Sequence, residues 1–421
     1  MMAINAVSSP RKITGALVAG AVTSGVLAGA GLGLAPTANA TCASIAGIGG
    51  GADCTSTLFS AAFAIGDGAQ AHASGSFSAA FAVGSGASAT TSAGVLDLAT
   101  TLLGDDNTVT ATGGFLNWAT NIGGSGNAVT TAGAIRNAAT NIGGTGNTVT
   151  TPQGGYLNFA RNLFGDGNTV TILGGQANTA LNLLGSNGTV TIVGGSANLA
   201  RNLFGDTNTV RVAGGNGNTA SNLLGGTGNT VLSQGGFLNS ARNVGGSGNA
   251  LEVGGLGSNL TTVLNLVSNG NTLTAGGGTG SNLDAVINTG GGGNTISAGP
   301  GNLNAGFNFL GNTNTVTAGP GPLALAGSVL QDDLTVTKTN PGIAINSFRV
   351  GGAVATSRQS STVPKANAVR IRTTGDRPKI VNAAGAITGS NTKIRKATVN
   401  AAGATTGSNK IRANDHRRPG K

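Results

Sequence analysis

A repeated phrase about 20 residues long fills the middle of the chain and limits the fold more than any other feature. The phrase is clearest at 104–121 and restarts at Ile122. Its Asn-Thr-Val step, or a close variant, returns mostly every 20 residues with slips of one to three, at Asn107, Asn127, Asn147, Asn168, Asn208, Asn229, Asn249, Asn271, Asn294 and Asn314. Stacked coils tolerate such slips, because extra residues can bulge at a turn. We therefore expect about twelve coils between about 102 and 337.

The first half of each copy has the pattern of a β-strand. Val109 lies between Thr108 and Thr110, and the later copies keep this arrangement of one apolar residue between polar ones. Alternation and β-branching predict that the valine points inward and the threonines outward. Gly113 and Gly114 follow, and they can supply a turn with positive φ that other residues would strain.

The second half of each copy places Asn117, Ala119 and Asn121 at alternate positions, so they share one face of a strand. We expect the alanine to face the valine strand, and the asparagine amides to donate and accept along the stacking axis. The predicted ladder comprises Asn117, Asn121, Asn137, Asn141, Asn158, Asn162, Asn178, Asn182, Asn198 and Asn202. A helix is the alternative for this half, although two Asn and a Gly within eight residues oppose it. The apolar residue that follows, such as Ile122 or Leu163, is expected to cap the corner before the next glycine.

Composition limits how these coils can pack. Hydrophobic residues make up 39% of the chain, but aromatics are 3% and there are 76 glycines, so the apolar side chains are mostly small. A charged fraction of 9% argues against disorder in the body. The prediction is an all-β fold, a β-solenoid of about twelve 20-residue two-strand coils with a disordered basic C-terminal tail. At about 4.8 Å per coil, the rod would be about 55 to 60 Å long.

The first 40 residues have the pattern of a signal peptide. Arg11 and Lys12 precede an uncharged stretch over 13–34, and Ala38 and Ala40 give the small-x-small pattern of a cleavage site. We expect cleavage after Ala40 and a secreted or cell-surface protein. A membrane-anchoring helix is the alternative, since the stretch approaches spanning length. No later segment has the length and hydropathy of a transmembrane helix.

Cys42 and Cys54 are the two cysteines of the chain. Export favours an oxidised pair over a metal site, with two unpaired thiols as the alternative. A bridge across this spacing contributes about 3 kcal/mol in the chain-entropy model and would pin the first coil.

A lead-in over 41–101 precedes the solenoid, which is expected to run over 102–350. Two copies of a short Ala/Gly pattern within 60–89 lie 18 residues apart and suit short strands. This pattern resembles the head repeats of trimeric autotransporter adhesins. The disulfide segment with these repeats is expected to cap one end, and 320–350 the other.

The tail over 351–421 differs in charge from the body. Residues 346–421 carry 15 basic and 2 acidic side chains, whereas 41–345 carry 6 and 11. Low apolar content with high charge favours disorder. Such a cationic tail is predicted to bind polyanions of the envelope or of host surfaces, and the alternative is a purely solubilising role. The candidate residues are Arg370, Arg372, Lys393, Arg395, Lys396, Lys410, Arg412, Arg417 and Arg418.

Two further resemblances concern the repeats. The leader, the Gly-Asn-Thr-Val repeats, the Ala-Gly-Pro-Gly-Pro-Leu-Ala phrase at 318–324 and the basic tail together resemble exported Gly/Asn-rich repeat proteins of mycobacteria. That resemblance implies export and leaves the function undefined. The Gly114-x-x-Asn117-x-Ala119 core is similar to the curlin repeat of secreted amyloid fibres, which implies self-association through the solenoid ends.

Sequence motifs of catalysis are missing from the chain. It has no phosphate-binding Gly-x-x-x-x-Gly-Lys-Ser/Thr loop, no Gly-x-Ser-x-Gly elbow and no paired-histidine metal motif. Calcium is an alternative, since Gly-Gly-x-Gly-Asn phrases resemble calcium-binding β-rolls, but Asn replaces the carboxylate ligand. We predict no cofactor, no metal, no specific nucleic acid and no enzyme activity. The predicted function is an exported structural or adhesive surface protein, and the alternative is a curlin-like fibre-forming subunit.

Overall fold

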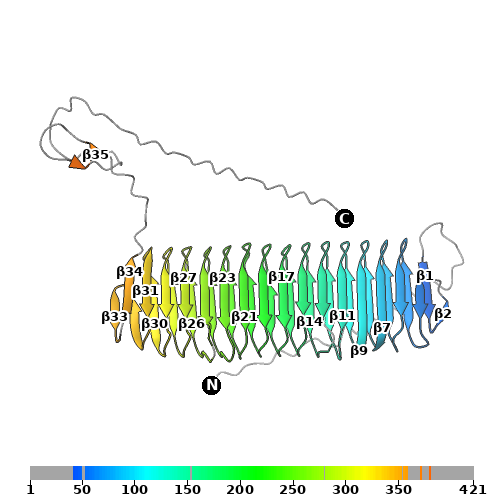
Figure 1. Ribbon diagram of the computed structural model, residues 1–421. Helices are drawn as coiled ribbons and strands as arrows, with labels where there is room; N and C mark the ends of the chain where they lie inside the picture. The colour runs from blue at the N-terminus through cyan, green and yellow to red at the C-terminus, as the bar shows by residue number, and fades with distance from the viewer. Residues whose placement is uncertain are drawn as a thin grey trace, which may run out of the picture. The chain divides into compact units, whose positions relative to one another are not determined.

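The protein is a two-sheet β-solenoid of about 14 turns, in which each coil contributes one strand to each sheet (Figure 1). The computed structural model describes residues 41–49, 53–151, 154–278, 280–352, 354–358, 370–371 and 379–380. None of these residues is helical, so the helix alternative for the second half-repeat is wrong. Accordingly, no helix in the described part of the chain is long and apolar enough to cross a membrane.

Two long sheets contain nearly all of the strands. Sheet A consists of β1 (Thr41–Ile45), β2 (Ile48–Gly49), β4 (Ala61–Ile65), β6 (Ala79–Val83), β8 (Leu98–Leu102), β10 (Trp118–Ile122), β12 (Ala138–Ile142), β14 (Phe159–Leu163), β16 (Thr179–Leu183), β18 (Leu199–Asn202), β20 (Thr219–Leu223), β22 (Ser240–Val244), β24 (Thr262–Leu266), β26 (Ala285–Thr289), β28 (Ala305–Phe309), β30 (Ala324–Val329), β32 (Gly342–Ile345) and β33 (Phe348–Val350).

Sheet B consists of β3 (Cys54–Ser56), β5 (Gln70–Ala73), β7 (Ser88–Val95), β9 (Thr108–Phe115), β11 (Ala128–Ala132), β13 (Thr148–Thr151), β15 (Thr169–Ile172), β17 (Thr189–Val193), β19 (Thr209–Ala213), β21 (Thr230–Gln234), β23 (Ala250–Gly254), β25 (Thr272–Gly276), β27 (Thr295–Ala298), β29 (Thr315–Ala318), β31 (Leu334–Lys338) and β34 (Val354–Arg358). A separate unit, 360–421, contains the short antiparallel pair β35 (Arg370–Ile371) and β36 (Lys379–Ile380).

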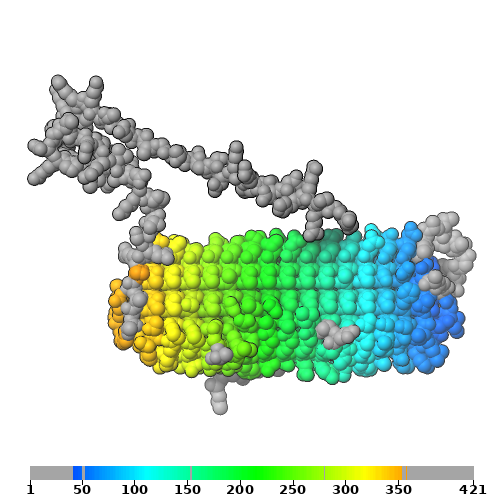
Figure 2. Space-filling model, in the orientation of Figure 1, coloured from blue at the N-terminus to red at the C-terminus, as the bar shows by residue number. Residues whose placement is uncertain are grey.

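Strands of successive coils pair in parallel and in register, so each residue lies beside its counterpart in the next coil. Val109 is the register partner of Val129, for example, and Asn121 is the partner of Asn141. The side chains consequently form rows that run from coil to coil along the body (Figure 2). At about 4.8 Å per coil, fourteen coils give a rod about 65 Å long.

The additional coils come from the lead-in. β4 pairs in parallel with β6, and β6 pairs with β8, with Phe63 opposite Phe81 and Ala80 opposite Ala99. The 60–89 repeats are therefore coils of the same stack, and the expectation that they cap an end is wrong. Their 18-residue period needs only shorter corners than the 20-residue period, because the strands have equal length.

Antiparallel strands end sheet A on both sides and sheet B at its last coil, whereas sheet B begins with the three-residue strand β3, which pairs in parallel with β5. At the first end β1 runs antiparallel to β4 and forms a hairpin with β2. At the other end β33 runs antiparallel to β32, and β34 runs antiparallel to β31. Covering a terminal parallel strand in this way satisfies backbone groups that another chain would otherwise pair with. Because β34 lies beyond residue 350, sheet B extends into the segment predicted to be tail.

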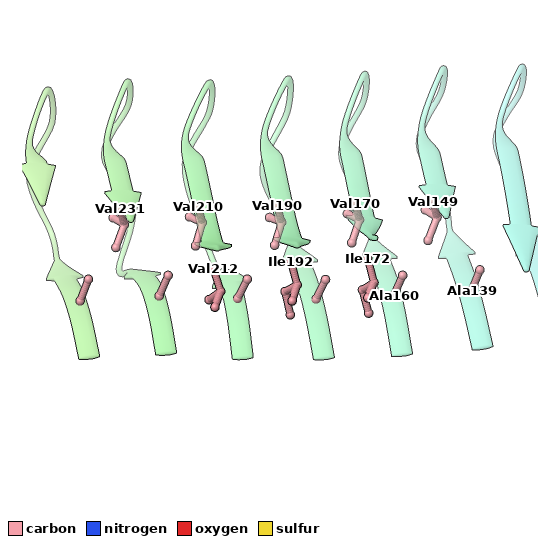
Figure 3. Packing of buried hydrophobic residues seen from close by; sticks show 14 of the residues in the cluster. Ala139, Val149, Ala160, Val170, Ile172, Val190, Ile192, Val210, Val212 and Val231 are labelled. Carbon is pink, nitrogen blue, oxygen red and sulfur yellow. The ribbon is translucent and has the colours of Figure 1, made fainter. Parts of the chain in front are cut away.

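The core is one residue thick on each side. Val109 and Ala119 and their counterparts are fully buried, and their side chains lie between the two sheets, with the alanines level with the second inward row described next (Figure 3). A second inward row, containing Ile172, Ile192 and Val212, lies two residues after the valines (Figure 3). The small, uniform side chains let the two sheets pack closely along the whole stack.

Glycines form the corners where the sequence places them. Gly113 has φ of 67° and Gly114 of 78°, in the left-handed region. A Cβ on Gly114 would also collide with the carbonyl oxygen of Gly133 in the next coil. Gly114 is therefore required both by its conformation and by the close approach of the following coil.

Candidate functional site: the rows and faces of the solenoid

Asn121 and its counterparts form an unbroken ladder of buried amides, as predicted. The Nδ2 of Asn141 donates to the Oδ1 of Asn121 at 2.7 Å, and Asn162 donates in turn to Asn141 at 2.8 Å. This Asn121 row comprises Asn121, Asn141, Asn162, Asn182, Asn202, Asn222, Asn243, Asn265, Asn288 and Asn308. Each amide thus satisfies its neighbours inside a dry core.

Asn117 and its counterparts bond mainly to backbone. The Oδ1 of Asn117 accepts from the backbone N–H of Asn137 at 3.1 Å, and the Nδ2 of Asn137 donates to the carbonyl of Gly155 at 2.9 Å. This Asn117 row comprises Asn117, Asn137, Asn158, Asn178, Asn198, Asn218, Asn239 and Asn304. At this corner the backbone turns away from the sheet, so the amide side chains of the Asn117 row make the hydrogen bonds to backbone groups that strand pairing makes elsewhere.

A third buried row was not predicted. The Oδ1 of Asn107 accepts from the N–H of Asn127 at 3.0 Å, and the Nδ2 of Asn107 donates to the carbonyl of Gly124 at 2.8 Å. This Asn107 row contains the first residue of every Asn-Thr-Val step. The recurrence of Asn at that position is the signal in the sequence, because an in-register stack places each Asn beside its counterpart in the next coil.

Two aspartates replace Asn in the Asn117 row. Asp97 precedes Asn117, and the Oδ1 of Asp284 accepts from the N–H of Asn304 at 2.8 Å. The Oδ2 atom of each is buried without a hydrogen-bond partner among the described residues. Burial raises the pKa of Asp97, and it raises the pKa of Asp284 to about 6, against the opposing hydrogen bonds from Asn117 and Asn304. An aspartate in this row is therefore more stable with its carboxyl group protonated than it would be in water.

The outer face of sheet B is a threonine face, as the alternation predicts. Thr148 and Thr150 point outward around the buried Val149, and each has a register partner of similar type in the next coil. The outward threonines include Thr108, Thr110, Thr130, Thr148, Thr150, Thr169, Thr171, Thr189, Thr191, Thr209, Thr230, Thr272, Thr274, Thr295, Thr315, Thr317, Thr335 and Thr337. This face repeats one hydroxyl-bearing pattern along most of the rod.

The outer face of sheet A is apolar, which the sequence reasoning missed. The residue expected to cap a corner is instead the last outward residue of its strand, and Ile122 is 37% exposed. We name the aliphatic residues at these positions the aliphatic row: Ile65, Val83, Leu102, Ile122, Ile142, Leu163, Leu183, Leu203, Leu223, Val244, Leu266 and Val329. Thr289 and Phe309 occupy the same register row, and Leu203 directly follows β18. The alternation of inward Asn121 with outward Ile122 gave the signal, because neighbouring strand residues face opposite ways.

Three arginines lie in the middle of this apolar face. Arg161, Arg201 and Arg242 are outward residues of β14, β18 and β22, at every second coil. The Nε of Arg201 donates to the Oγ of Ser221 at 3.0 Å in the coil between. Partial burial lowers the pKa of Arg201, and the positive charge of Arg242 lowers it further.

The remaining predicted sites are structural or lie elsewhere. Cys42 and Cys54 form a disulfide with their Cα atoms 5.7 Å apart, joining the first strands of the two sheets. His72, which the sequence gives no role, has its Nδ1 2.8 Å from the Oγ1 of Thr55. In the described ranges no group of three His, Cys, Asp or Glu side chains is placed to hold a metal ion. Of the candidate tail cations, Arg370 lies in β35, and the other eight lie outside the described residues.

Comparison with protein-family models, with curated proteins and with solved structures finds no match to this chain. Its rows and faces are therefore the basis for assigning a function.

Proposed function

We propose that this protein is an exported structural or adhesive surface protein, a repetitive β-solenoid rod without a catalytic site. Its basic tail holds it at the cell envelope or binds polyanions. The observation that supports this best is the threonine face, where an outward pair of threonines occurs in seven of the twelve coils from Thr108 and Thr110 to Thr335 and Thr337. A pattern repeated along a rod gives many similar weak contacts, and linked weak contacts produce strong overall binding.

The antiparallel strands at three of the four sheet edges favour a single rod over a curlin-like fibre. Fibre growth would require the terminal strands to accept another chain in the pattern of the interior, which is parallel. Here β1, β33 and β34 end three of the four sheet edges with antiparallel strands, and the fourth edge is the three-residue parallel strand β3. An edge covered by an antiparallel strand does not present the repeating interior surface to a second molecule.

Cell fractionation tests the proposed function. The full-length protein and a variant lacking 360–421 would be followed in the medium, in envelopes washed at low salt and in envelopes washed at high salt. We expect full-length protein on the envelope, with release at high salt, because contacts of a cationic tail to polyanions are screened. The shortened variant should appear in the medium. Full-length protein found only in the medium, in the same amount as the variant, would oppose retention by the tail.

A further inference from the structure

The aliphatic row is continuous and partly exposed along the rod, rather than a set of scattered residues. Ile122 is the register partner of Leu102 on one side and Ile142 on the other, and the pairing continues coil by coil. Leu102, Ile122 and Phe309 are 36%, 37% and 38% exposed, and the other positions of the row are half-buried between their neighbouring coils. Monomeric proteins rarely expose apolar patches longer than a few side chains, and larger ones mark interaction sites.

Further apolar side chains widen this surface. Trp118, the only tryptophan of the chain, starts strand β10 on the same side as Ile122 and is 48% exposed. Phe63 and Phe81 extend the face at the first coils, and Phe307 extends it near the last. We call the outward positions of β4 through β30 the apolar face.

The charge on the apolar face has one sign. Arg161, Arg201 and Arg242 lie on it, and no Asp or Glu occupies any of its outward positions. The nearest acidic residues of these coils lie in the corners, where the Oδ1 of Asp166 accepts from the N–H of Thr145 and that of Asp206 accepts from Ser186. A surface that is apolar and cationic complements a partner that is apolar and anionic.

A second copy of the face is a poor partner. The arginines lie in the sixth, eighth and tenth of the fourteen coils, close to the middle. A two-fold pair of apolar faces would therefore bring the arginines of one copy against those of the other. The other parts of the chain fit no better, because the leader carries Arg11 and Lys12 and residues 360–421 are basic.

We propose that the apolar face docks on an anionic lipid surface, with the aliphatic row and Trp118 entering the interface and the three arginines pairing with headgroups. Aliphatic side chains gain by leaving water, and tryptophan is favoured at the boundary between headgroups and acyl chains. Arginine keeps its charge at the headgroups while its stem lies along the apolar region. The threonine face, on the opposite sheet, then points away from the lipid. The docking depends only on the apolar face and holds whether or not the threonine face is adhesive.

Fluorescence of Trp118 tests this docking, because a single tryptophan reports on this face alone. The full chain would be titrated with vesicles of phosphatidylcholine and with vesicles containing phosphatidylglycerol. We expect the emission to move to shorter wavelength with the anionic vesicles, and a soluble quencher to lose access to Trp118. Glycerol phosphate, which carries the charge without the acyl chains, should cause no shift.

Matched variants separate the face from the leader and the tail, which stay the same in all of them. The triple variant Arg161→Gln, Arg201→Gln, Arg242→Gln should partition about 100-fold more weakly into anionic vesicles. Arg211→Gln makes the same change on sheet B and should bind as the unmodified chain does. Ile122→Thr combined with Ile142→Thr keeps β-forming residues and should weaken partition at least about 10-fold.

Three results would overturn the proposal. The first is co-sedimentation with vesicles while Trp118 emission stays unchanged, since binding would then involve other segments. The second is equal partition of the triple arginine variant and the unmodified chain. The third is a lipid-free dimer in sedimentation velocity that Ile122→Thr with Ile142→Thr dissociates, which would make a second copy the occupant.

Discussion

Replacing Asp284 by Asn should stabilise the protein at neutral pH. Asp284 is fully buried in the Asn117 row, its Oδ1 already accepts from Asn304, and its Oδ2 has no partner among the described residues. An amide at this position keeps the acceptor and replaces the unpartnered oxygen with an Nδ2 donor. In the first coils of the row that donor reaches glycine carbonyls, as Asn178 does to Gly174 and Gly195 at 3.1 Å, whereas the Nδ2 of Asn304 has no partner among the described residues.

The size and the sign of the effect follow from the pKa. Burial raises the pKa of Asp284 from 3.8 to about 6, so between these pH values the folded state binds more protons than the unfolded state. The contribution of the neutral carboxyl to stability is fully present below pH 3.8 and is lost as pH rises through about 6. At about 1.4 kcal/mol per pH unit, the rise from 3.8 to about 6 corresponds to about 3 kcal/mol.

Urea unfolding followed by circular dichroism at several pH values measures this effect. Asp284→Asn should raise the free energy of unfolding by up to about 3 kcal/mol at pH 7, and the difference should shrink towards pH 4. Asp206→Asn makes the same chemical change at an exposed corner, where the expected effect is within about 0.5 kcal/mol. A difference between Asp284→Asn and the unmodified protein that stays constant from pH 4 to pH 7 would refute the reasoning.

Three other changes have defined outcomes. Asn202→Ala removes the acceptor for Asn222 and the donor to Asn182. The free energy of unfolding should therefore fall by about 2 to 4 kcal/mol. A fall of under about 1 kcal/mol would contradict the buried ladder. Val190→Ala should cost about 2 kcal/mol because two buried methyl groups are lost, whereas Thr189→Ala on the outer face of the same strand should cost under about 0.5 kcal/mol. Equal losses would contradict the assignment of Val190 to the inward side of the strand. The double variant Cys42→Ser, Cys54→Ser should lower the free energy of unfolding by about 3 kcal/mol and should speed hydrogen exchange in β1 and β4. Unchanged exchange in these strands would show that the disulfide does not hold the first coil.

Residues whose role is local could be predicted from the sequence. Val109 between threonines identifies a strand and its inward side, and Gly113 with Gly114 identifies a corner, because period and backbone freedom act over a few residues. The amide stack of Asn121 was also predictable, since repetition in register brings identical side chains together. Asn107 was missed as a ladder residue because it stands at the strand edge, where its bonds go to backbone of the next coil.

Features that depend on more than one segment were harder to predict. The lead-in coils have an 18-residue period, and only the pairing of β6 with β8 shows that they belong to the same stack. The apolar face was missed because each aliphatic residue is followed by a corner, which suggested a local capping role for Ile122. The second inward row escaped notice because it varies between Ala111, Thr131 and Ile172.

Distances between spin labels test the solenoid most directly. One register row on the outer face of sheet B contains Thr130, Arg211, Thr274 and Thr317. The two native cysteines form a disulfide and therefore do not react with the spin label. Three double variants each combine Thr130→Cys with a second cysteine, at Arg211, Thr274 or Thr317. Their two labels lie four, seven and nine coils apart, respectively. Pulsed electron paramagnetic resonance should give about 19, 34 and 43 Å, a linear increase of about 4.8 Å per coil. Distances that do not increase with the number of intervening coils would contradict the parallel, in-register stack.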